Sequence, residues 1–249
     1  MCIRDRFGIF FKDNLRNLRP SRWWRLNHQV GYKLQALLQL RTHLAENVRQ
    51  ILWGDDSEAD AVIYSLYSDL CSRRLSEDQA REILRYFRVF GNQVDSIFEI
   101  LESIPHHDPV EKIYINLASD TDTEYYLKFG RRTLPTYNSF QLALDLFQDS
   151  RLSEAQVVKV SQDLVQNFGF SVDDLEKSID DLVRRPVLAD ETLEKILPVL
   201  KEFQLIRKEF APNATPRKIV SRIGQRVFEL EGCNDSWVAD HISYTRDDR

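Results

Sequence analysis

Residues 51–67 read ILWGDDSEADAVIYSLY, a stretch in which an apolar run is followed by a glycine, a group of acids and a second apolar run. The first run is short and apolar, which predicts a buried strand over 48–54 that ends at Gly54. The second run has helical spacing and predicts a helix from Ser57 through Cys71. Four acids therefore stand where a strand passes into a helix: Asp55, Asp56, Glu58 and Asp60.

Two physical explanations account for this group of acids. Carboxylates are favoured at the positive N-terminal end of a helix, and Asp55 or Ser57 could cap it. A cap contributes about 1 kcal/mol, but it needs one residue rather than four. Alternatively, Asp55 and Asp60 converge on a hard cation, with Asp56 as a reserve ligand. Mg²⁺ is the natural choice because it binds one or two carboxylates together with water and phosphate oxygens. This stretch alone leaves both explanations open.

A lysine upstream favours the cation. Lys33 lies in a helix predicted over 27–44, where Leu26, Val30, Leu34, Leu37 and Leu38 have helical spacing. From this position its ammonium could reach the same end of the strand and neutralise a phosphoryl oxygen. A solvated surface lysine is the alternative, and the pairing with Asp55 makes the phosphate role the stronger hypothesis.

The order of elements is typical of an α/β domain with a mostly parallel sheet. Strands are predicted over 7–11, 48–54 and 111–118. Helices are predicted between them, one of which opens with the capping box SEDQ at 76–79. Ligands bind at the carboxyl ends of the strands in such sheets, which is where Asp55 lies.

The pattern changes after about residue 119, where strand signals vanish. Four amphipathic helices are predicted, in SFQLALDLFQD, SEAQVVKVSQDLVQNF, SVDDLEKSIDDLVRR and ETLEKILPVLKEFQLIRKEF. A shorter helix is predicted near 216–231, and the tail SYTRDDR is expected to fray. We therefore divide the chain into an α/β domain at 7–118, a helical accessory region at 119–209, and a short helix with a frayed tail at 210–249.

Composition narrows the functional class. The chain has 249 residues and a net charge of −5. Residues 1–50 hold ten Lys/Arg against three acids (+7), and the remainder holds 24 against 36 (−12). This localised basic segment suits an anionic substrate group better than a nucleic acid. The three scattered cysteines fit a reducing, cytoplasmic compartment and are too few for a disulfide framework. No apolar run reaches the length of a membrane helix.

The segment GDDSEADAVIY resembles the fourth motif of the haloacid-dehalogenase (HAD) superfamily of phosphohydrolases, in its phosphatidate-phosphatase-like branch. Gly54, Asp55 and Asp60 fill the motif, and Tyr64 follows one turn later. HQVGYK resembles the third motif and places its lysine at Lys33, and FGIFFKD resembles the preceding strand. The resemblance implies a Rossmannoid sheet and Mg²⁺-dependent hydrolysis of a phosphate monoester through an aspartyl-phosphate. Asp55 and Asp60 would serve the metal, and Lys33 would hold the nucleophile and the phosphoryl group.

The start of the chain departs from this pattern. Residues 1–6, MCIRDR, resemble translated sequencing adapter, and no DxDxT-like run carrying the family's nucleophilic aspartate occurs. We therefore expect a C-terminal fragment with an incomplete sheet and no phosphatase activity of its own.

Other features suggest partners. Arg131 and Arg132 in KFGRRTLPTYN offer a second phosphate contact, with a solvated loop as the alternative. HHDP at 106–109 is read as a turn rather than a metal site. RPSRWWRL at 19–26 suits a lipid surface, although a packed loop is favoured. The substrate class is thus a phosphorylated small molecule or a lipid headgroup. The competing hypothesis is a non-catalytic helical module in which residues 119–249 bind a protein partner.

Overall fold

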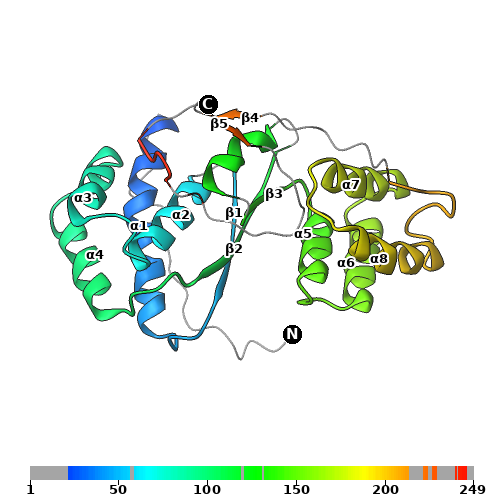
Figure 1. The fold of residues 1–249 in the computed structure, drawn as a ribbon, viewed down its shortest axis with the longest axis horizontal. Coiled ribbons are helices and arrows are strands. Elements are labelled where there is room, and N and C mark those ends of the chain that lie inside the picture. Colours follow the sequence, from blue (N-terminus) through cyan, green and yellow to red (C-terminus); the bar gives the residue numbers. More distant parts are fainter. Residues whose placement is uncertain are drawn as a thin grey trace. The chain divides into compact units, whose positions relative to one another are not determined.

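A computed structural model describes residues 22–56, 59–118, 121–130, 132–212, 221–223, 226–228, 239 and 241–245. The predicted strand at 7–11 and the segment 1–6 lie outside these residues. The chain forms two compact units (Figure 1). Unit 1 comprises Met1–Ile115, Tyr125–Leu134 and Val238–Arg249, and unit 2 comprises Asn116–Glu124 and Pro135–Trp237.

A small parallel sheet, ordered β1-β2-β3, is built from β1 (Gln50–Asp55), β2 (Val110–Asn116) and β3 (Thr133–Thr136). The Ile113 amide donates to the Arg132 carbonyl at 2.9 Å and the Leu117 amide to the Thr136 carbonyl at 2.8 Å. Both pairs differ by 19 in residue number, as parallel pairing requires. The α/β class and the strands predicted near 48–54 and 111–118 are confirmed.

β3 shows that the expected loss of strands after residue 119 is wrong. All four of its residues, TLPT, are buried. The strand is too short to show a period, and Pro135 is unusual within a strand because it lacks an amide donor. For these two reasons the sequence pattern did not predict β3.

The described residues of unit 1 form the α-helices α1 (Arg22–Thr42), α2 (Asp60–Cys71), α3 (Glu77–Tyr86) and α4 (Asn92–Ser103). The 3₁₀-helix η3 (Thr123–Phe129) begins in unit 2 and continues into unit 1. Val30, Leu34 and Leu38 are fully buried along one face of α1, as their spacing predicts. The helix packs on α2 and α4 (Figure 1). A Cβ at Gly31 would lie 2.7 Å from Gln93 Oε1 and 2.9 Å from Val89 Cγ2, so the glycine permits close approach near α4.

Helix ends follow one recurring pattern. Arg73, after α2, and Ser150, after α5 (Ser139–Gln148), have φ values of 54° and 57°. In each case the next amide bonds the carbonyl five residues earlier, which is the Schellman arrangement. Ser76 and Ser153 then open the following helices with complete capping boxes. The similarity of RLSEDQ at 74–79 and RLSEAQ at 151–156 thus reflects a turn followed by a cap.

Unit 2 is built mainly from α5 (Ser139–Gln148), α6 (Glu154–Asn167), α7 (Val172–Arg184) and α8 (Asp190–Glu202), which confirms the four predicted helices. α5 packs on α6 and α7, and α6 packs on α8. Polar contacts join the N-terminus of α5 to α7, where Asn138 Nδ2 donates to Ser178 Oγ at 2.9 Å. The fully buried apolar side chains of this bundle include Phe140, Leu144, Val157, Leu175, Ile179 and Ile196.

The segment 210–249 differs from its prediction. Where a helix was expected near 216–231, β4 (Ser221–Ile223) pairs antiparallel with β5 (Arg226–Phe228). The sequence between them is Gly-Gln, and a two-residue connection that starts with glycine is typical of hairpins. The expected fraying of the tail is also wrong at Tyr244, which is buried and whose hydroxyl donates a hydrogen bond to Asp69 of α2.

Candidate metal and phosphate site

Asp55 is the last residue of β1 and Asp60 is the first residue of α2. The Asp60 side chain is buried, and its carboxylate accepts a hydrogen bond from the Asp55 amide at 3.2 Å. The N-cap of α2 is Ala59, which makes no side-chain capping bond. Asp55 is therefore not the N-cap of α2, and Ser57 lies outside the described residues. Asp60 occupies the first turn, where the helix dipole favours a negative charge.

Lys33 reaches this junction from α1. Its ammonium forms an ion pair with Asp60 Oδ1, and the lysine side chain remains 28% exposed. Lys33 and Asp60 are 27 residues apart in the sequence, and the structure brings them into contact at the end of β1. A buried carboxylate is stabilised by such a partner, which compensates part of its desolvation.

Gly54 makes this arrangement sterically feasible. A Cβ at position 54 would collide with the Cβ and the carboxylate of Asp60. Any larger residue would displace the acid from the strand end, so the Gly-Asp pair of the motif has a packing reason.

The remaining acids differ in exposure. Asp55 is exposed and Asp56 is half-buried. Among the described residues no group of three or more His, Cys, Asp or Glu side chains surrounds one metal position. The set therefore fits Mg²⁺ only in the form that uses one or two carboxylates, with water and a phosphate oxygen as further ligands.

The two arginines predicted to bind phosphate have different outcomes. Arg131 lies outside the described residues. Arg132 is buried, with 2% of its side chain exposed. Its guanidinium donates to Asp108 Oδ2 at 2.7 Å, to Ser68 Oγ at 2.5 Å and to the Val110 carbonyl at 3.1 Å. The interpretation of Arg132 as a phosphate contact is corrected accordingly: it is a structural residue of unit 1.

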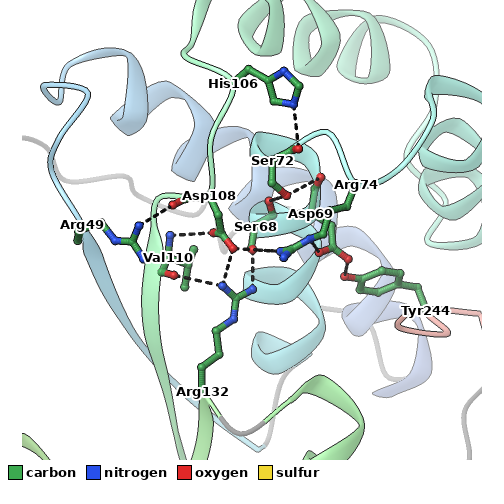
Figure 2. A network of polar contacts seen from close by, with 10 residues as sticks. All are labelled: Arg49, Ser68, Asp69, Ser72, Arg74, His106, Asp108, Val110, Arg132 and Tyr244. Carbon is green, nitrogen blue, oxygen red and sulfur yellow. Dashed lines mark hydrogen bonds and ion pairs between the residues drawn. The ribbon is translucent and has the colours of Figure 1, made fainter. Parts of the chain in front are cut away.

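Arg132 belongs to a polar network on α2 that sequence reasoning missed (Figure 2). Arg74 contacts Asp69 Oδ1 at 2.7 Å and Asp108 Oδ2 at 3.1 Å, and Tyr244 donates to Asp69. HHDP is a loop, as predicted, and its Asp108 accepts from both arginines. Arg74 and Arg132 thus place two cations beside the carboxylates of Asp69 and Asp108.

Burial and charge act in opposite directions on the two carboxyl groups of this network. Burial raises the pKa of Asp69 by more than Tyr244 and Arg74 lower it. For Asp108, burial would raise the pKa, but the nearby Arg132 and several hydrogen bonds outweigh it, so the net pKa is lowered. Beside the local partners Arg74 and Val110, the difference depends on Tyr244 and Arg132, which are distant in sequence from the carboxyl groups that they contact.

No family model, curated protein or solved structure matches this chain. The helices in the described part of the chain include none long and apolar enough to cross a membrane.

Proposed function

We propose that residues 33–60 supply the metal- and phosphate-holding part of a Mg²⁺-dependent phosphohydrolase of the HAD type. The observation that carries this proposal is the ion pair between Lys33 and Asp60, beside Asp55 at the carboxyl end of β1. The helix dipole favours Asp60 in the first turn of α2, but Asp55 precedes the helix and ends β1. An exposed acid at this strand end, with a lysine at the same junction, suits a phosphate ester. The substrate would be a phosphate monoester, whether a small molecule or a lipid headgroup.

Each side chain has a distinct role in this proposal. Asp55, exposed at the strand end, would ligate Mg²⁺, with Asp56 as the reserve ligand. Asp60 is engaged by Lys33 and by the Asp55 amide, so its main role would be to hold both in place. When bound, Mg²⁺ would polarise a phosphoryl oxygen. The Lys33 ammonium would neutralise another, and the proposal assigns the nucleophilic aspartate to no residue of this chain.

The test is calorimetric titration of Mg²⁺ into the purified chain and its Asp55→Asn variant. Removing a charged ligand should weaken Mg²⁺ binding by about tenfold or more. Asp78→Asn is the matched control, because Asp78 is an exposed acid like Asp55 but lies in the first turn of α3. No binding by the wild type, or equal binding by Asp55→Asn, would contradict the proposal.

A second candidate function concerns unit 2 as a protein-interaction module. Phe168 and Phe203, at the C-terminal ends of α6 and α8, are 67% and 51% exposed, and large exposed aromatic side chains are typical of contact surfaces. If Mg²⁺ does not bind at Asp55, this function becomes the better explanation of the chain.

A further inference from the structure

Two tyrosines on α2 donate hydrogen bonds to β1, one at the first residue of the strand and one closer to its last residue. Tyr67 Oη donates to Gln50 Oε1 at 2.6 Å, at the first residue of the strand. Tyr64 Oη donates to the Trp53 carbonyl at 2.8 Å, two residues before the strand ends. Tyrosines three positions apart lie on one face of a helix, so both hydroxyls reach the same strand.

The bond from Tyr64 fixes the peptide on one side of Gly54. The Trp53 carbonyl belongs to the peptide that joins residues 53 and 54, and the Asp55 amide belongs to the peptide that joins 54 and 55. The first accepts from Tyr64 and the second donates to Asp60. Glycine has the greatest backbone freedom of any residue, so these two bonds remove freedom where the chain has most of it.

We propose that Tyr64 is a positioning residue that orients Asp55 toward the divalent cation. This inference rests on the proposed function, because it assigns Tyr64 a task at the same site. Tyr64 acts through the backbone of Trp53 and Gly54 and does not contact the metal or the phosphate. Removing a group that orients a metal ligand without touching the metal typically lowers metal affinity by about 10–100-fold.

Tyr64→Phe tests the proposal, and Tyr67→Phe is its matched control. Each substitution deletes one hydroxyl that joins α2 to β1, but only Tyr64 serves the end that carries Asp55. Mg²⁺ titration should show affinity reduced by about tenfold in Tyr64→Phe and unchanged in Tyr67→Phe. Amide hydrogen exchange at Gly54 and Asp55, without metal, should accelerate in Tyr64→Phe alone.

The outcomes separate the two claims. If the wild type does not bind Mg²⁺, the proposed function fails, and the metal-positioning role of Tyr64 fails with it. If the wild type binds and Tyr64→Phe binds equally well, the positioning role is overturned and the proposed function stands. Equal losses of Mg²⁺ affinity in both variants would show a general loss of packing between α2 and β1. This result would also overturn the positioning role of Tyr64.

Discussion

Tyr244 and Asp69 are 175 residues apart in the sequence, yet the tyrosine hydroxyl donates a hydrogen bond to the aspartate near the C-terminal end of α2. Both side chains are buried. Asp69 also accepts from Arg74 Nε, so its carboxylate has a cationic partner and a neutral one. The segment that follows unit 2 is thus attached to unit 1 through a specific polar contact.

Tyr244→Phe should destabilise unit 1 by about 1–2 kcal/mol, because a buried carboxylate oxygen loses its donor. Two measurements check this: urea denaturation gives the free energy of unfolding, and amide hydrogen exchange reports the local stability of α2. Tyr86→Phe is the control, since Tyr86 is 48% exposed on α3 and its substitution should change stability by less than about 0.5 kcal/mol. Equal effects of both substitutions would contradict a specific role for the Tyr244 hydroxyl.

Alkaline pH should destabilise unit 1 through the same tyrosine. Burial, and then the neighbouring Asp69, raise the pKa of Tyr244 well above its ordinary value of 10.0. A raised pKa in the folded state means that this stabilisation is complete below about pH 10 and is lost as the pH rises above the unfolded value. Burial also raises the pKa of Tyr67, so two tyrosines contribute.

The pH effect has a defined size and a defined control. Each tyrosine lowers the free energy of unfolding by up to about 1.4 kcal/mol per pH unit above pH 10. Denaturation of unit 1 at pH 8 and at pH 11 should therefore show a smaller pH-dependent loss in Tyr244→Phe than in the wild type. An identical loss in the two proteins would exclude Tyr244 as a source.

Ser150→Gly should stabilise unit 2 by about 0.5–1 kcal/mol, because Ser150 holds a left-handed φ of 57° that glycine adopts without strain. Gly169→Ala should have the opposite effect, of about 1 kcal/mol. Gly169 has φ of 73°, and a Cβ there would meet nothing within 4 Å, so the cost is purely conformational. Thermal denaturation of the two variants measures both effects, and shifts of the same sign would refute the backbone explanation.

Arg132→Gln should destabilise unit 1 by about 2–3 kcal/mol, because the Asp108 carboxylate would lose its closest cation. This value is below the range for a fully buried pair because the Asp108 side chain is 22% exposed. Arg49→Gln is the control, since Arg49 is exposed and contacts only the Asp108 carbonyl in that loop, at 3.3 Å. Urea denaturation distinguishes the two variants. A loss of less than about 0.5 kcal/mol for Arg132→Gln would contradict the structural role assigned to this arginine.

Local patterns predicted much of the architecture. The apolar run before Gly54, the helical spacing after it and the capping boxes at Ser76 and Ser153 each depend on residues within a few positions of one another. Such features determine where helices and strands begin. The approach of Lys33 to Asp60 also followed from the expected α/β order.

Non-local pairing accounts for what the sequence did not reveal. Arg132 stands in a Gly/Pro-containing stretch that is typical of an exposed loop, and only the fold shows that Asp108 and Ser68 surround it. β3 depends on pairing with β2 rather than on its own four residues. Tyr244 gave no local signal, because its partner lies in a helix made much earlier in the chain.

Unit 2 interrupts unit 1 in the sequence, and this has a consequence for synthesis. A ribosome adds residues in order, so the nascent chain contains all of α5 to α8 before it contains Tyr244. The helices α5 to α8 can therefore pack on one another before the Tyr244 hydroxyl is available to donate to Asp69. Although its strands and helices emerge first, unit 1 is the later of the two to complete its interior.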